Sequence, residues 1–105
     1  MNKVVLTGRI EGEVKENGSE HRVLFFILAA GSGFKTQTNE EHITYVPCVL
    51  FNPKDGLKEK LVSASGTQFI ELEGSIRKSS YTKNGEKRYT MEVQVNPNSV
   101  QTLGF

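Results

Sequence analysis

One segment near the end of the chain combines positive charge with aromatic rings. Residues 77–90 read RKSSYTKNGEKRYT, in which five cations and one acid give a formal charge of +4. Asn84-Gly85 lies between two strand-like arms, and this dipeptide favours a tight hairpin turn because both turn positions need φ > 0. Lysine and arginine can neutralise the phosphates of a nucleic acid, and tyrosine rings can stack on its bases. The spacing therefore predicts a cationic finger, residues 77–90, able to hold a nucleic-acid strand.

The rest of the chain does not share this charge. The whole sequence has a net charge of +1, so the residues outside the finger sum to −3. Residues 11–20 hold four glutamates and are predicted to form an acidic turn around Asn17-Gly18 that does not face nucleic acid. A charged hairpin with tyrosines is also common in antiparallel sheets, because tyrosine is a good strand residue. Both interpretations of the finger stay open at this point.

Length and composition indicate one globular domain over residues 1–105. Charged residues make up 24% of the sequence and apolar residues 36%, as in ordinary globular chains. Cys48 is the single cysteine, which excludes an internal disulfide and suits a reducing compartment. No apolar run reaches the length of a membrane span, and residues 1–6 enter a strand pattern directly, unlike a signal peptide. We expect a cytoplasmic protein.

The elements that must position the finger show alternation of apolar and polar residues, which predicts strands. Five strands are expected, over residues 4–10, 22–30, 43–51, 68–76 and 89–95. Leu57 and Leu61, four residues apart, predict a short helix over residues 57–64. Gly8 and Gly74 are expected at bends that let a sheet close. The sequence thus predicts an all-β, five-stranded oligonucleotide-binding (OB) fold barrel with one short helix between strands 3 and 4.

The predicted strand over residues 22–30 is apolar on both faces. Its two faces carry Leu24, Phe26 and Leu28, and Val23, Phe25 and Ile27. Because a barrel strand needs only one buried face, the other face must find cover elsewhere. We expect a partner subunit to supply it, giving a homo-oligomer, either a dimer or a tetramer. A helix or loop of the same chain is the alternative.

The next two segments offer further aromatic residues. Residues 31–41 are polar and predict a flexible loop that exposes Phe34 and Lys35. In the strand that follows, alternation places Cys48 inward, with Tyr45, Pro47 and Phe51 on the opposite face. Proline cannot donate to a strand ladder, so Pro47 predicts an edge or a bulge at that position.

Six segments of the chain, in order, resemble bacterial single-stranded DNA-binding proteins. They are residues 1–9 (MNKVVLTGR), 26–29 (FILA), 45–51 (YVPCVLF), 70–77 (IELEGSIR), 88–93 (RYTMEV) and 100–103 (VQTL). The resemblance covers nearly the whole chain. It implies sequence-nonspecific binding and protection of single-stranded DNA in replication, recombination or repair.

The resemblance also implies particular binding residues. The base-stacking positions of the family correspond to Phe34, Tyr45, Phe51 and Tyr81, although the family often has tryptophan there and this chain has none. For Phe51, burial in a core or interface is an equal alternative. The cations expected to neutralise phosphates are Lys35, Arg77, Lys78, Lys83, Lys87 and Arg88.

Two departures and two alternatives qualify this interpretation. First, the chain has no long tail with an acidic tip, as expected for a trimmed protein or a tailless phage, plasmid or primosomal relative. Second, Pro47 stands where the family often has a basic residue. The alternative function is a primosome-type adaptor that acts mainly through protein contacts. RNA binding by a cold-shock-like barrel is less favoured, because closely spaced strand aromatics are missing.

The sequence gives no indication of an enzyme, a cofactor or a metal site. His21 and His42 lie in polar turns beside glutamates, and Cys48 is predicted inward, so no nucleophile–base pair is recognisable. Two histidines and one cysteine at this spacing do not make a zinc site. We therefore predict no catalytic residues.

Overall fold

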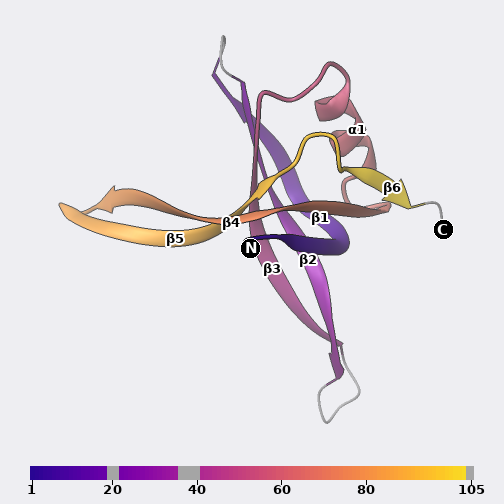
Figure 1. The fold of residues 1–105 in the computed structure, drawn as a ribbon, viewed down its shortest axis with the longest axis horizontal. Coiled ribbons are helices and arrows are strands. Elements are labelled where there is room, and N and C mark those ends of the chain that lie inside the picture. The colour runs from indigo at the N-terminus through magenta and orange to yellow at the C-terminus, as the bar shows by residue number, and fades with distance from the viewer. Residues whose placement is uncertain (19–21, 36–40, 104–105) are drawn as a thin grey trace.

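The computed structural model describes residues 1–18, 22–35 and 41–103, with only the backbone at 32–35 and 41. The described chain is almost entirely strands, with one helix (Figure 1). In order, the elements are β1 (Val4–Asn17), β2 (Val23–Lys35), β3 (Glu41–Phe51), α1 (Leu57–Ala64), β4 (Phe69–Lys83), β5 (Glu86–Val95) and β6 (Gln101–Leu103). The helix has the bounds that the sequence predicted.

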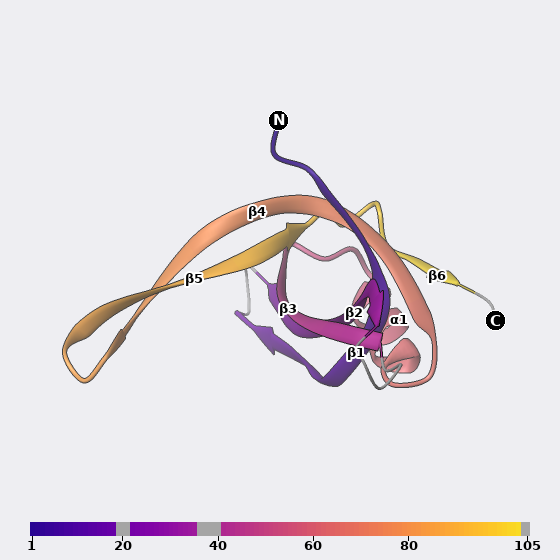
Figure 2. The same cartoon turned by 90° about the horizontal axis from the view of Figure 1, so that it is seen from below.

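Five of the strands close into a ring. The sheet order is β1-β2-β3-β5-β4-β6, and β1 also pairs with β4. The β3–β5 pairing is parallel and the other pairings are antiparallel. Figure 2 shows these strands curving around a common interior. The predicted all-β ring with a helix between the third and fourth strands is confirmed.

The interior of the ring is apolar. Its largest fully buried side chains are Ile10, Leu24, Leu28, Leu50, Leu61, Ile70 and Leu72. Most of them lie at alternate strand positions, so each strand contributes one face to the core. Leu57, Leu61 and Ala64 on one side of α1 join the same core. Burial of one such side chain contributes about 1.5–3 kcal/mol.

Gly8 and Gly74 allow the strands to approach closely where the ring closes. A Cβ atom at Gly8 would collide with the carbonyl oxygen of Ala29, and one at Gly74 with that of Gln94. Gly8 pairs with both β2 and β4, and Gly74 with both β1 and β5. The predicted role of both glycines in closure is therefore supported by the packing around them.

Several sequence predictions were wrong about where strands end. The acidic segment is not mainly a turn, because β1 runs through it to Asn17, with a register shift between Glu11 and Lys15. β2 extends through residues 31–35, where a loop was expected, and the expected C-terminal tail includes β6, which pairs with β4. Long-range ladders extended strands beyond their local apolar patterns in each case.

Two predictions for single positions also need comment. Alternation along residues 68–76 places Ile70, Leu72 and Ile76 on the inward face, yet Ile76 is 43% exposed because it lies where β4 begins to leave the ring. Pro47 is not on an edge strand, since β3 lies between β2 and β5. The β5 pairing includes only Cys48 and Val49, so Pro47 borders the part of β3 that β5 leaves unpaired.

Candidate nucleic-acid interface

The cationic finger projects from the ring as a two-stranded hairpin (Figure 1). β4 and β5 pair continuously from Gly74–Val95 to Lys83–Glu86. The turn has φ of 52° at Asn84 and 77° at Gly85, which confirms the tight turn predicted from this dipeptide. Pairing of β4 with β1 ends at Gly74, so the finger has no further strand beside it.

One face of the finger, the Tyr81 face, carries Arg77, Tyr81, Lys83 and Arg88 together with two acids. Arg77 forms an ion pair with Glu92 (Nε–Oε1 3.5 Å), and Arg88 forms one with Glu86 (Nη2–Oε2 3.1 Å). The Tyr81 ring is 51% exposed. This face therefore presents an open ring, two guanidinium groups that already have carboxylate partners, and the Lys83 ammonium near the turn.

The opposite face, the Tyr89 face, carries Lys78, Lys87 and Tyr89. The Nζ atoms of Lys78 and Lys87 lie 4.0 Å and 5.7 Å from the centroid of the Tyr89 ring. Within the described part of the chain, neither lysine takes part in an ion pair, and the same holds for Lys83. The lysines predicted from the sequence are thus the finger's unpaired cations.

The finger is connected to the wall of the ring through Phe51. The Arg77 guanidinium carbon lies 5.1 Å from the centroid of the Phe51 ring, which is half-buried. Tyr45 lies on the same outward face of β3 and is 59% exposed. Six residues separate the two, which places them about 20 Å apart along a strand. The structure thus brings Phe51 to the finger, while Tyr45 lies further along the wall.

Two predicted binding residues lie outside the side chains that the structure describes. The backbone of Phe34 and Lys35 belongs to β2, and Lys35 is opposite Glu41 in β3. The proposed roles of these two side chains stay predictions.

Sequence reasoning missed Arg9 and Phe69. The Arg9 guanidinium carbon lies 4.9 Å from the centroid of the Phe69 ring, on the outside of the ring of strands. No periodicity in the sequence links these residues, because they become neighbours only through the β1–β4 register. An outward arginine directly after Gly8 was the one available signal.

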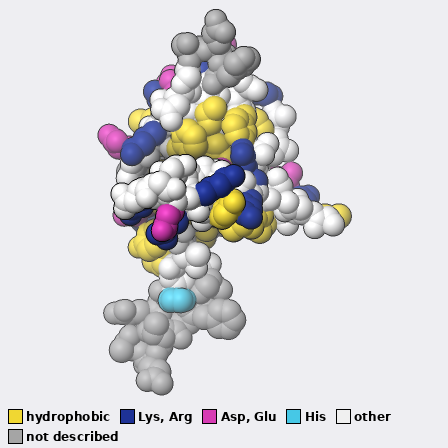
Figure 3. Space-filling view, turned by 90° about the vertical axis from the view of Figure 1, so that its left-hand side faces the viewer, with side chains coloured by type: hydrophobic (Ala, Val, Ile, Leu, Met, Phe, Trp, Pro, Cys, Tyr) yellow, Lys and Arg dark blue, Asp and Glu magenta, His cyan; other side chains and the backbone are white. Residues whose placement is uncertain are grey.

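The second apolar face of β2 is outward, as predicted. Phe25 is 36% exposed and Ile27 is 38% exposed, and they border a groove of about 240 Å³ with Pro47. Figure 3 shows hydrophobic side chains gathered into a patch beside the finger, which points toward the viewer. The helix α1 contributes to the core instead of covering this face.

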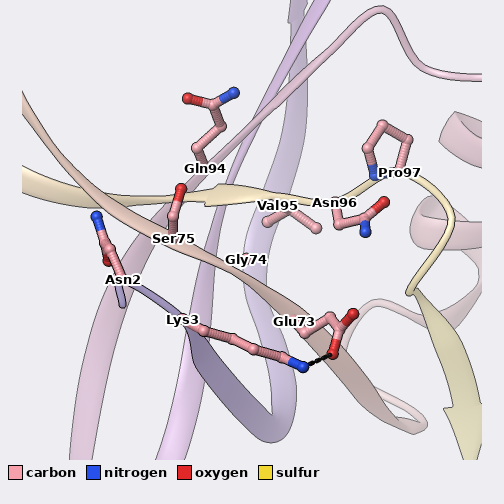
Figure 4. A pocket seen from close by; sticks show the side chains of 9 residues that line it. All are labelled: Asn2, Lys3, Glu73, Gly74, Ser75, Gln94, Val95, Asn96 and Pro97. Atoms are coloured by element: carbon pink, nitrogen blue, oxygen red, sulfur yellow. Dashed lines mark ion pairs between the residues drawn. The ribbon is translucent and has the colours of Figure 1, made fainter.

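A larger groove, of about 450 Å³, lies where β1 joins β4 (Figure 4). Its cation, Lys3, is paired with Glu73 at 3.3 Å, and no aromatic side chain lines it. The Asn2 side chain extends the ladder there, donating to the Ile76 carbonyl (2.7 Å) and accepting from the Ile76 amide (2.9 Å). These contacts close the ring and offer nothing on which a base could stack.

The buried thiol of Cys48 is not activated for chemistry. Cys48 is buried as predicted, and burial, with the nearby Glu92 charge, raises the pKa of its thiol to about 12. Among the described residues, no three acidic, histidine or cysteine side chains gather as metal ligands would. None of the described helices has the length and apolar character needed to span a membrane.

Comparisons with known proteins all find single-strand binding proteins. The model of the single-strand binding protein family matches residues 1–103. Single-stranded DNA-binding protein 1 of Streptococcus pyogenes serotype M6 is 30% identical over 95 residues, which cover 88% of this chain and 70% of that protein. A solved structure of a Plasmodium falciparum SSB complex with ssDNA has a TM-score of 0.71 at 21% identity, covering 98% of this chain and 93% of that one. At that identity, the structural likeness concerns the fold.

Proposed function

This chain belongs to the single-strand binding protein family, and from that membership we propose that it binds and protects single-stranded DNA with little sequence preference. Such a protein acts in replication, recombination or repair. The observation that carries the proposal beyond the family match is the finger, whose unpaired lysines and exposed rings lie side by side. Phosphate neutralisation and base stacking need this combination.

The lysines Lys78, Lys83 and Lys87 would hold the phosphates. Each phosphate neutralised on a single strand releases counterions and adds about 0.7 to the slope of log affinity against log salt. Arg77 and Arg88 would contribute less, because each must exchange a carboxylate for a phosphate. Affinity should therefore fall steeply with salt.

The rings of Tyr45, Phe51 and Tyr81 would stack on bases. A stacked base contributes about 1–3 kcal/mol, and every base has a ring face, so the order of bases matters little. The exposure of Tyr45 and Tyr81 supports this role. Phe34 and Lys35 are included in this proposal only because of the family resemblance.

The outward face of β2 would be the contact between subunits. Phe25 and Ile27 leave apolar surface exposed beside the finger, and burying it against a second copy would remove it from water. We expect a dimer or a tetramer in the bacterial cytoplasm, or in the host of a mobile element, acting as a binding protein without catalysis. Native mass measurement of the free protein gives the number of subunits directly, and a monomer at micromolar concentration would exclude this role for the face.

The test of the function is an anisotropy titration of a dye-labelled poly-dT oligomer at several salt concentrations. We expect tight binding at low salt and a strongly negative salt slope. Competition with the matched RNA oligomer measures the preference for DNA. Absent binding at low salt, or binding indifferent to salt, would refute the proposal.

A further inference from the structure

The Asn2 side chain takes the place of a strand at the root of the finger (Figure 4). β1 pairs with β4 as far as Val4, which is opposite Gly74, and the same register continued by two residues places Asn2 opposite Ile76. In an antiparallel ladder, the N–H and C=O of one residue point to the same neighbour. The Asn2 amide meets both groups of Ile76, donating to the carbonyl (2.7 Å) and accepting from the N–H (2.9 Å). Because an amide side chain has both a donor and an acceptor, it can copy the backbone of a strand residue.

This contact lies at the last point where the finger has neighbours on both edges. On the other side of β4, Ile76 is opposite Val93 of β5, and Val93 is opposite Cys48 of β3. Among the described strands, none pairs with either outer edge of the finger beyond this point. We call Asn2, Ile76, Val93 and Cys48 the root row, since these residues connect the finger to the ring.

The proposed DNA-binding track begins directly after the root row. Arg77 follows Ile76, and its guanidinium carbon lies 5.1 Å from the centroid of the Phe51 ring on the wall of the ring. β4 and β5 pair continuously from the root row to the turn, so the finger can rotate as one unit. The end of β4 at Lys83 lies about 24 Å along the strand from Ile76. A small change of angle at the root row would therefore move the tip far from the wall.

We propose that Asn2 is a positioning residue for DNA binding, which fixes the direction of the finger relative to the wall of the ring. This inference rests on the proposed function and goes beyond it, because Asn2 touches neither phosphate nor base in this role. Its amide keeps Arg77 and Tyr81 in line with Phe51. A bound strand can then pass from the wall onto the finger without a break.

One substitution tests this role, and the chain offers a matched control. Asn2→Ala removes the amide at the root row. The Ser99 hydroxyl also bonds both backbone groups of one β4 residue, donating to the Glu73 carbonyl (3.0 Å) and accepting from the Glu73 N–H (3.0 Å). Glu73 lies in the part of β4 that belongs to the ring, opposite Val5. Ser99→Ala therefore removes similar bonds without touching the root of the finger.

Hydrogen exchange followed residue by residue tests the bond itself. The Ile76 amide should exchange slowly in the wild-type protein, and Asn2→Ala should speed its exchange about tenfold, as expected for one lost hydrogen bond. Ser99→Ala should leave this amide unchanged. An Ile76 amide that exchanges equally fast with and without the Asn2 side chain would overturn the proposal.

Spin labels measure the direction of the finger in the absence of DNA. Cysteines that replace Thr82 near the turn and Val62 on α1 can carry the labels, since both positions are exposed and Cys48 is buried. Asn2→Ala should broaden the distribution of distances between the two labels, whereas Ser99→Ala should not. An unchanged distribution in Asn2→Ala would contradict the positioning role.

Poly-dT titration connects the direction of the finger to binding. Asn2→Ala should weaken binding about threefold to tenfold, with an unchanged salt slope because no cation is lost. Ser99→Ala should bind like wild type. If wild-type protein binds and Asn2→Ala binds equally well, the positioning role is wrong while the proposed function stands.

Two further outcomes are distinguishable from that one. Wild-type protein that does not bind poly-dT would refute the function on which the inference rests. Weaker binding by Asn2→Ala with an unchanged distribution of label distances would mean that Asn2 contacts DNA directly, which would also overturn the positioning role.

Discussion

The two faces of the finger differ although their residues alternate along the same two strands. On the Tyr81 face both arginines are paired with carboxylates, whereas on the Tyr89 face Lys78 and Lys87 gather around a ring without an ion pair. The formal charge of +4 is therefore not spread evenly: two of the three unpaired ammonium groups lie on the Tyr89 face, and the third, that of Lys83, shares the other face with the open Tyr81 ring. A charge count from sequence therefore overstates the number of cations available to a ligand.

This difference suggests that the two faces of the finger make different kinds of contact with DNA. A lysine over a tyrosine ring at an exposed site gains about 0.5–1 kcal/mol, and its ammonium donors stay free for a phosphate. The Lys78 ammonium covers the Tyr89 ring, so Tyr81 is the ring better placed to stack on a base. We expect the Tyr89 face to supply phosphate contacts and the Tyr81 face to supply stacking.

The largest expected effect is the loss of the unpaired lysines. Lys78→Gln combined with Lys87→Gln should weaken poly-dT binding on the order of fiftyfold at 50 mM salt and lower the salt slope by about 1.4, for two released phosphates. Anisotropy titration at several salt concentrations measures both quantities. A salt slope that does not change would show that these lysines do not contact phosphates.

Tyr81→Ala should have the next largest effect. Loss of one stacking ring should weaken poly-dT binding about tenfold, within the range of about 1–3 kcal/mol per base. The thermal melting temperature should change little, because Tyr81 is exposed. Tyr89→Ala is the matched comparison and should weaken poly-dT binding less. If Tyr89→Ala weakened binding more than Tyr81→Ala, the roles assigned to the two faces would be wrong.

Glu86→Gln should have a smaller effect of opposite sign. Removing the carboxylate releases Arg88 from its exposed ion pair, which stabilises the fold by only about 0–1 kcal/mol. Binding at low salt should then become about two- to threefold tighter, as measured by the same titration. Weaker binding by this variant would mean that Glu86 positions Arg88 for the DNA instead of competing with it.

The smallest effect is expected when the same pair is removed as a unit. Glu86→Gln combined with Arg88→Gln leaves the net charge unchanged and keeps the Tyr89 face intact. Poly-dT affinity should stay within about twofold of wild type, because an exposed pair of this kind contributes little. A loss comparable with that of the lysine variant would show that the two faces hold phosphates equally.

Much of the fold was predictable because it depends on local patterns. The bounds of α1 followed from two leucines four residues apart, and the turn of the finger followed from Asn84-Gly85. Strand ends were less predictable: β2 and β4 run on beyond their apolar alternation because neighbouring strands continue to pair with them. β6 is too short to show any periodicity.

The candidate site was predictable in its residue types but not in its arrangement. The exposure of Tyr45 and Tyr81 and the inward side chain of Cys48 agree with alternation along single strands. The ion pairs of Arg77 and Arg88 could have been suspected from the cross-strand and next-but-one positions of their acids. Whether the named residues bind DNA stays a prediction.

The sequence by itself determined which positions alternate, where the chain turns and that the strand over residues 22–30 is apolar on both faces. Only the tertiary structure decided which outward residues became neighbours. Arg9 meets Phe69 and Tyr45 stands across Ala29 because strands distant in the chain pair in one particular register. A shift of that register by one residue would turn these side chains to the other face. Local patterns therefore fix the face of a side chain, and long-range pairing fixes its neighbours.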